Sequence, residues 1–163
     1  MITQSELQSM LDYNSNTGIF TWKIKTKKIK IGQEAGYKST NGYLIIRINY
    51  HNYLAHRLVW LYVYGNFPSI LDHINGIKND NRLCNLRLCT RSQNQYNHKN
   101  YSTNTSGVKG VSWNNRMQKW KVAIRTEIGR IHLGYFKSLD DAKCIIIEAR
   151  NKYHGEFANH GYN

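Results

Sequence analysis

Acidic residues are scarce in this sequence. Ten Asp and Glu stand against 23 Lys and Arg, which leaves a formal net charge of +13, and both halves of the chain carry the basic excess. Such a field attracts polyanions and makes their binding depend on salt. The charge therefore favours a nucleic acid over a small neutral substrate, without distinguishing DNA from RNA. The competing interpretation is a basic surface with no specific partner.

Cysteine is also scarce, and long apolar runs are missing. Cys84, Cys89 and Cys144 form no C-x-x-C pair, so the sequence predicts neither a disulfide framework nor a structural zinc site, and a reducing cytoplasm is the expected location. No apolar run approaches the roughly 20 residues that span a bilayer, and the amino terminus lacks a signal-peptide pattern. We expect a soluble protein with no membrane partner, made of one ordinary domain or two small ones.

What the sequence does contain is a polar stretch with regular spacing, LDHINGIKNDNRLCNLRLCTRSQNQYN, from Leu71 to Asn97. Asp72 and His73 are adjacent, Asn85 follows twelve residues after the histidine, and Asn94 comes nine residues later. A carboxylate next to a histidine, facing a helix that supplies a third polar ligand, can hold one divalent ion beside a general base. This pattern indicates phosphodiester hydrolysis.

Each of these residues also has a structural interpretation when taken alone. Asp72 before a loop is typical of turn and cap residues, which bond nearby backbone amides. A single histidine is more often structural than catalytic, and asparagine, which is abundant in this chain, favours turns and caps. Only the joint spacing favours catalysis.

Thr90 and Gln93 have the spacing of a capping box, which predicts a helix with Asn94 one turn inside it. His98 is then expected on a neighbouring part of the same helix surface, where it competes with Asn94 as a metal ligand.

The surrounding pattern, DHINGxxxDNRxxNLRxxTxxQN, resembles the His-Asn-His (HNH) endonucleases of phages and mobile introns, in the form in which asparagine replaces the last histidine. In that family two antiparallel strands and a helix grip one metal ion. The resemblance implies that Asp72 and Asn94 ligate the metal, that His73 is the base that activates water, and that Asn85 fixes the loop and orients the histidine. Because the ligands are oxygens, the expected ion is Mg²⁺, with Mn²⁺ able to substitute.

Arginines flank this stretch at Arg82, Arg87 and Arg91. Each either neutralises and positions the scissile phosphate or is simply solvated. Upstream, the string AHRLVW extends the resemblance to phage HNH proteins. His56 in this string either contacts the DNA backbone or is a locally bonded structural residue at the start of a helix, and it is not predicted to be catalytic.

The amino-terminal part should be built from short elements. The pattern predicts a helix over residues 3–12, a strand over 18–26, a hairpin over 43–55 with its turn at 50–52, and a helix that runs from Ala55 and is ended by Gly65.

Beyond a polar linker at residues 99–107, the pattern changes to three short strands and a helix that begins after Ser138. Its motifs KGV, K-W-x-x-x-I-R and G-R-x-x-L-G-x-F resemble the DNA-binding domain of plant ethylene-response factors (the Apetala type), which is also found fused to phage HNH nucleases. In that family the sheet lies in the major groove. By position, the DNA-facing residues are Lys109, Ser112, Asn114, Lys119, Arg125, Arg130 and His132. Three of them depart from the plant pattern (Ser112, Asn114 and His132), so the base preference does not transfer. Trp113 and Trp120 are expected in the core.

These patterns together predict an α+β protein. A ββα-metal HNH module with an amino-terminal extension occupies residues 1–98, with its active site over 71–98, and a small three-stranded antiparallel sheet packed on one helix occupies residues 108–158. The expected function is metal-dependent cleavage of double-stranded DNA by a site-preferring nicking or homing enzyme of a phage or mobile element. One site per chain favours a monomer on DNA, and a double-strand break requires a dimer or two visits. The alternatives are a DNA-binding regulator with a decayed nuclease, an RNA-binding protein and a structural basic protein.

Overall fold

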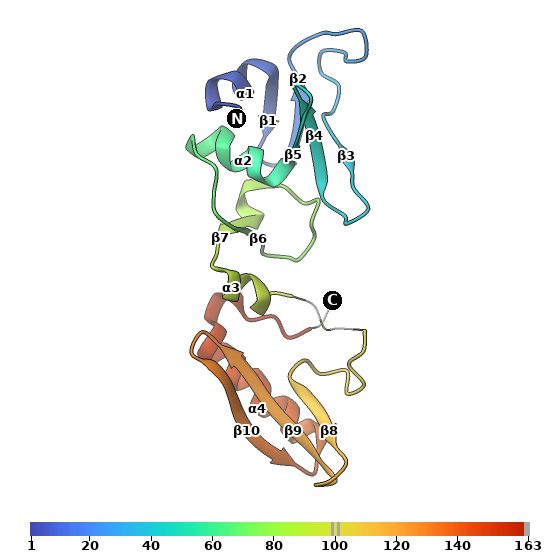
Figure 1. Cartoon of the computed structure of the whole chain (residues 1–163), viewed down its shortest axis with the longest axis vertical. Helices are drawn as coiled ribbons and strands as arrows, with labels where there is room; N and C mark the ends of the chain where they lie inside the picture. Colours follow the sequence, from blue (N-terminus) through green and yellow to red (C-terminus); the bar gives the residue numbers. More distant parts are fainter. Residues whose placement is uncertain (99, 101, 162–163) are drawn as a thin grey trace. The chain divides into compact units, whose positions relative to one another are not determined.

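The computed structural model of the chain describes residues 1–98, 100 and 102–161. These residues divide into two compact units, Met1–Cys89 and Thr90–Asn163, each with its own hydrophobic core (Figure 1). Both units combine helices with small antiparallel sheets, which confirms the predicted mixture of α and β structure. Within the described part of the chain, no helix has the length and apolar character needed to cross a membrane.

The first unit contains three small sheets, made of the pairs β1–β2 and β6–β7 and the triplet β3–β4–β5. In chain order its elements are α1 (Gln4–Met10), β1 (Leu11–Asn14), β2 (Ile19–Trp22), β3 (Tyr37–Lys38), β4 (Leu44–Ile48), β5 (His51–Leu54), α2 (Ala55–Tyr64), β6 (Leu71–His73), the 3₁₀ turn η1 (Leu83–Asn85) and β7 (Leu86–Leu88).

Helix α1 begins with a capping box between Thr3 and Glu6. It ends earlier than the predicted helix over residues 3–12, because Leu11 starts strand β1 and lies opposite Trp22 of β2. This pairing buries Leu11 completely in the core. In a last helical turn exposed to solvent, the same side chain would keep contact with water.

The hairpin of β4 and β5 turns at Asn49 and Tyr50, both of which have positive φ angles, of 48° and 65°. The predicted turn at residues 50–52 is therefore wrong by one to two positions. A two-residue turn with two left-handed residues matches the right-handed twist of the strands, and asparagine tolerates that conformation. The short strand β3, which was not predicted, adds to this hairpin.

Helix α2 packs into the core of the first unit through Leu58, Val59 and Leu61. Gly65 ends it in the left-handed conformation, with φ of 76° and its N–H bonded to the carbonyl of Leu61, so the predicted stop is confirmed. The helix start is thereby anchored to a rigid core, and this start carries His56.

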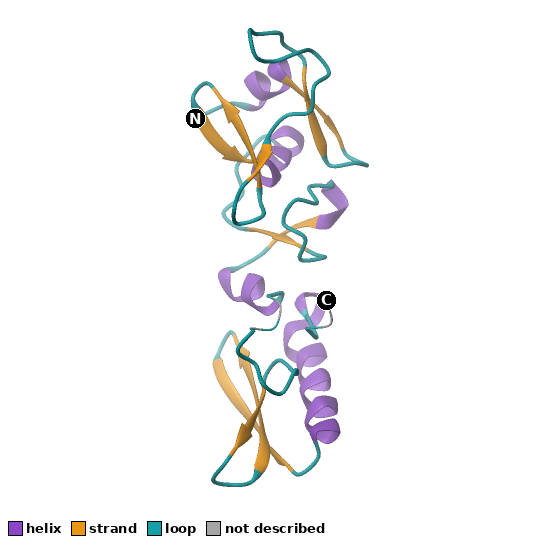
Figure 2. Ribbon diagram, turned by 90° about the vertical axis from the view of Figure 1, so that its right-hand side faces the viewer, coloured by secondary structure: helices purple, strands orange, loops and turns teal. Residues whose placement is uncertain are grey.

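The second unit is a three-stranded antiparallel sheet in the order β10–β9–β8, with α4 along one face (Figures 1 and 2). Its elements are α3 (Arg91–Tyr96), β8 (Val111–Asn114), β9 (Lys119–Thr126), β10 (Gly129–Phe136), α4 (Leu139–His154) and the 3₁₀ turn η2 (Gly155–Phe157). Val122 and Ile124 of β9 pack against Ile146 of α4. The three predicted strands and the helix are confirmed, and Ser138 is the N-cap that accepts bonds from two backbone amides.

Helix α3 is held by residues of the second unit. Lys109 Nζ donates to the carbonyl of Tyr96 at 2.8 Å, the ring of His154 stacks on that of Tyr96 at 3.8 Å, and Asn159 Nδ2 donates to the carbonyl of Asn97 at 2.9 Å. The contacts therefore group α3 with the carboxy-terminal sheet, whereas the sequence places it with the nuclease module. The boundaries at 98 and 108 stay a prediction, and two residues of the predicted linker, 99 and 101, lie outside the described residues.

Candidate active site

Strands β6 and β7 present the adjacent acid and histidine. Asp72 lies opposite Arg87 and His73 opposite Leu86, and the acid and the histidine are each only 5% exposed. Arg87 donates through Nε and Nη2 to Asp72 Oδ2, at 2.9 and 2.8 Å. Arg87, predicted to flank the site as a DNA contact, thus faces the carboxylate and balances its charge. The two bonds hold the carboxylate of Asp72 in one direction.

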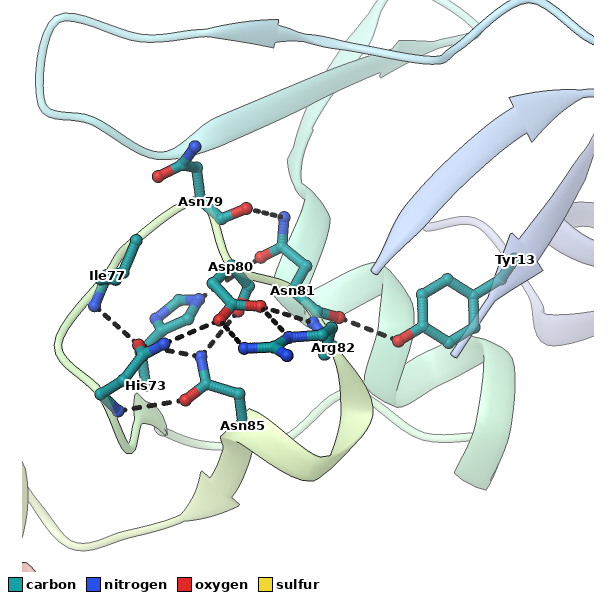
Figure 3. A network of polar contacts seen from close by, with 9 residues as sticks. Tyr13, His73, Ile77, Asn79, Asp80, Asn81, Arg82 and Asn85 are labelled. Atoms are coloured by element: carbon teal, nitrogen blue, oxygen red, sulfur yellow. Dashed lines mark hydrogen bonds and ion pairs between the residues drawn. The ribbon is translucent and has the colours of Figure 1, made fainter. Parts of the chain in front are cut away.

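The imidazole of His73 is held by a buried asparagine (Figure 3). His73 Nε2 lies 3.3 Å from Asn81 Oδ1, and Asn81 is 1% exposed. The amide nitrogen of Asn81 donates to the carbonyl of Asn79 at 3.4 Å, which turns its oxygen toward the histidine. Because this oxygen only accepts, we assign the proton to Nε2 and the lone pair to Nδ1. Tyr13 reinforces the arrangement by donating its hydroxyl to the carbonyl of Asn81 at 2.8 Å.

Burial determines the charge of His73. Removal of the ring from water lowers its pKa below the ordinary value, against the opposing effects of the Asn81 bond and the neighbouring Asp72 carboxylate. The imidazole is therefore neutral at physiological pH. A neutral ring is the form that a general base requires.

Asn85 ties together the loop that follows His73. Its Oδ1 accepts from the backbone N–H of Asn75 at 3.0 Å, and its Nδ2 donates to Asn75 Oδ1 at 3.0 Å and to the carbonyl of Asp80 at 2.8 Å. The side chain thus spans two points of the loop (Figure 3). Asn85 thus makes the hydrogen bonds expected of a residue that fixes the loop. The role of Asn85 in orienting His73 stays a prediction.

Asp80 adds a second layer to this network. It receives Nε and Nη2 of Arg82 at 2.8 and 2.6 Å and Nδ2 of Asn75 at 2.7 Å. These bonds, the arginine first, hold the pKa of Asp80 at about 2. The sequence analysis assigned no functional role to Asn75 or to residues 79–81. Their presence in the motif that carries the HNH resemblance was the signal that could have identified them.

His56 reaches this site from the first turn of α2. Its side chain is 7% exposed, and its ring centroid lies 5.0 Å from that of His73. Burial lowers its pKa to about 3, so the ring is neutral and adds no positive charge beside His73. His56 is too buried to contact a DNA backbone, so that interpretation is wrong, and it is a buried residue at the start of a helix, as the structural interpretation expected. Its Nδ1 has no hydrogen-bond partner within the described residues.

The other predicted metal ligands belong to the second unit. The capping box of Thr90 and Gln93 is confirmed, and Asn94 lies in the first turn of α3, as expected. The helix ends at Tyr96, and the N–H of His98 bonds to the carbonyl of Gln95. The prediction that His98 lies on the surface of the helix is therefore wrong. The choice between Asn94 and His98 as a metal ligand stays open.

The chemistry of the proposed donors fits a hard divalent ion. A carboxylate from Asp72 and an amide oxygen from Asn94 are ligands that Mg²⁺ accepts, with water completing the shell. No group of three His, Cys, Asp or Glu side chains within the described ranges is placed to hold a metal.

One face of the carboxy-terminal sheet is open and basic. The opposite face carries Val122 and Ile124 against α4, and cross-strand pairing puts six of the predicted DNA-facing residues together on the open side: Ser112, Asn114, Lys119, Arg125, Arg130 and His132. Arg91, also predicted as a contact, is exposed at the start of α3. The sheet thus presents one contiguous cationic surface.

Lys109 and Trp113 depart from their predicted places. The ammonium of Lys109 is used on the carbonyls of Tyr96 and His98, and burial lowers its pKa to about 8. Trp113 is 40% exposed, with its ring 4.9 Å from that of the half-buried Trp120. The expectation that Trp113 is a core residue is therefore wrong, and its strand, β8, is an edge strand of the sheet.

Comparison with known proteins places this site in a family. Residues 53–96 match the family described as HNH endonuclease. The chain is 34% identical to protein 3.8 of Escherichia phage T7 over 105 residues, which cover 63% of this chain and 86% of that protein. It is 43% identical over 63 residues to an uncharacterized HNH endonuclease of Acanthamoeba polyphaga mimivirus, over 37% of this chain and 33% of that protein. No solved structure matches.

Proposed function

The chain belongs to the HNH endonuclease family, and on that premise we propose that it is a metal-dependent DNA endonuclease with His73 as its general base. The observation that carries this proposal is a buried histidine, bonded through Nε2 and adjacent to a carboxylate that pairs with Arg87. In this proposal Nδ1 of His73 is the nitrogen that accepts the proton.

Residues of the chain accept the proton of the attacking water and hold the reactive side chains in position. Nδ1 of His73 takes a proton from a water molecule as that water's oxygen bonds to phosphorus and the bond from phosphorus to the 3′ oxygen breaks. The departing 3′ oxygen takes a proton from solvent water, so the products are a 5′ phosphate and a 3′ hydroxyl, as in the family. Asn81 stabilises the imidazolium that forms, because it accepts the Nε2–H bond in both protonation states. Arg87 keeps the Asp72 carboxylate in a fixed direction.

A divalent ion completes this site in the proposal. Asp72 and Asn94 would hold it, and when bound it supplies positive charge to the phosphate as negative charge develops there. We propose Mg²⁺ as the ion and expect Mn²⁺ to substitute, since both accept oxygen ligands.

The open face of the carboxy-terminal sheet is the proposed duplex-binding surface. Its exposed arginines, Arg125 and Arg130, have the charge and reach to contact phosphates and base edges, and His132 and Ser112 are exposed on the same face. With one histidine base per chain, a monomer nicks one strand. Site preference, and a role in a mobile element, are finer parts of the same proposal.

The test follows conversion of supercoiled DNA to relaxed and linear forms, with a gel-shift assay on the same proteins. Wild type, His73→Ala and His51→Ala are compared with Mg²⁺, with Mn²⁺ and with chelator, because His51 is an exposed histidine on β5 and serves as a matched control. We expect wild type and His51→Ala to nick only with metal, and His73→Ala to lose about 10²–10⁴-fold while still binding. Nicking by His73→Ala at the wild-type rate would remove the histidine from its role. If all three proteins bind DNA and none of them nicks it, the result would favour a DNA-binding regulator.

A further inference from the structure

His56 touches the proposed base but has no part in the mechanism above. Its ring meets that of His73 with centroids 5.0 Å apart and planes at 73°, an edge-to-face contact. Aromatic pairs in this geometry restrict one another, because rotation of either ring brings atoms into overlap. His73 is thus confined on one side by His56 and on another by the bond to Asn81.

Tyr43 forms the third side of this arrangement. Its ring lies 5.3 Å from that of His56 and 6.1 Å from that of His73. Lys78, on the loop that follows the histidine, places Nζ 5.0 Å from the centre of the Tyr43 ring and donates to the carbonyl of Asn41 at 3.1 Å. The group of three rings is therefore held by helix α2, which carries His56, and by the loop after His73, which carries Lys78.

The burial of His56 calls for a physical explanation. An imidazole that is 93% removed from water, with Nδ1 unbonded among the described residues, costs stability that an apolar side chain would not. Leucine or valine would fill similar space but would lack a flat edge to place against a second ring. Retention of a compact planar ring beside the base suggests that its shape serves the site.

We propose that His56 is a positioning residue that fixes the plane of the His73 imidazole, so that Nδ1 points at the attacking water. The bond to Asn81 sets which nitrogen carries the proton, and His56 sets the direction of the other one. This inference rests on the proposed function, since it takes His73 as the base.

Three variants of α2 test the proposal by steady-state nicking. His56→Ala removes the ring and should lower kcat about 10–100-fold with KM for DNA unchanged, since misplacement of the reacting groups acts on the chemical step. His56→Phe keeps a planar ring and should remain within about threefold of wild type. Val59→Ala is the control, because it truncates a fully buried side chain of the same helix. Each is assayed at the same temperature interval below its own Tm.

Two kinetic results would overturn the inference. One is a wild-type kcat for His56→Ala, and the other is a loss for Val59→Ala as large as that for His56→Ala, which would indicate a general packing effect. If His56→Ala does not fold, Tyr43→Leu removes the ring that backs His56, and the inference then requires a fall of about 3–10-fold in kcat.

Side-chain NMR of His73 separates this inference from the proposed function, because it needs neither DNA nor metal. The Cε1–H signal of His73 should be a single sharp resonance in wild type and in His56→Phe. It should broaden or split in His56→Ala as the ring samples more orientations. If wild type nicks DNA but His56→Ala leaves this signal unchanged, positioning by His56 is wrong and the nuclease assignment stands. If wild type never nicks, the nuclease assignment fails whatever the signal does.

Discussion

The two units place their polar side chains in opposite ways. In the first unit the candidate reactive groups are buried, with Asp72, His73 and Asn85 each at 5–6% exposure and bonded to protein partners. In the second unit, Arg125 and Arg130 extend from an open sheet face into solvent. Hydrolysis needs groups that are already oriented before substrate arrives, whereas binding a polyanion needs exposed charge.

The two units also differ in how their charged side chains are paired. In the first unit, cations meet carboxylates in the pairs Arg87–Asp72 and Arg82–Asp80. On the open face of the second unit, Arg125 lies directly opposite Arg130 in the strand ladder. Like charges in that position destabilise a sheet. A phosphate backbone would relieve the repulsion, so this surface should respond to DNA and to salt more than the first unit does.

Of the changes considered, loss of the Asn85 side chain should have the largest effect, and the effect should fall on stability and nicking rather than on DNA binding. Asn85→Ala removes three hydrogen bonds and leaves the backbone of the active-site loop unpaired, so we expect the free energy of unfolding to fall by about 2–4 kcal/mol. Nicking by the folded protein should fall about 10²-fold, because the loop no longer holds its geometry. Asn52→Ala, an exposed change on β5, is the control. Equal losses in gel-shift affinity and in nicking would contradict the separation of roles.

Lys109→Met tests to which unit helix α3 belongs. The change removes the ammonium that donates to the carbonyls of Tyr96 and His98 and should destabilise the second unit by about 2 kcal/mol. Hydrogen exchange of the α3 amides should then speed up at least tenfold, while the β4 amides of the first unit keep their rates. Lys152→Met, on an exposed part of α4, should change neither. Faster exchange in both units would mean that they unfold together.

Local patterns explain what could be predicted from the sequence. The Thr90–Gln93 capping box, the Gly65 stop and the helix start after Ser138 each depend on neighbours along the chain, and all three are confirmed. The turn of the β4–β5 hairpin was predicted one to two positions too late, because tyrosine is rarely left-handed and Asn49–Tyr50 therefore carries no strong turn signal.

The unpredicted parts depend on contacts between residues far apart in sequence. The contact of His56 with His73 requires the start of α2 to lie against β6, and no periodicity encodes that. The bond from Tyr13 to the carbonyl of Asn81 joins residues 68 positions apart. In the same way, Lys109 reads as an exposed cation in the KGV motif, and only the fold turns it toward α3.

Acid should weaken the first unit through Asp80. Its pKa is about 2 in the folded protein against an ordinary value near 3.9 when unfolded, so its stabilising effect is fully present above about pH 4 and is lost as the pH falls toward 2. Asp80→Asn should lower Tm by a few degrees at pH 7. The difference from wild type should shrink to almost nothing by pH 2, in thermal melts read at the first unit. Glu34→Gln, which changes an exposed carboxylate of the same unit, should show no such convergence.

The smallest expected effect concerns single lysines of the second unit, and it bears most directly on the open face. Lys119→Ala and Lys152→Ala each remove one positive charge, the first from the open sheet face and the second from α4, so net charge falls equally. If the face contacts phosphates, Lys119→Ala should weaken duplex binding about 3–10-fold and reduce the slope of log affinity against log salt by about 0.9, while Lys152→Ala changes both much less. Equal effects would mean diffuse attraction to a basic protein, and the sheet would then lose its role as the binding surface. At saturating DNA neither variant should alter the nicking rate, because neither lysine belongs to the unit that holds His73. A slower rate for Lys119→Ala under those conditions would show that binding and chemistry are not divided between the units.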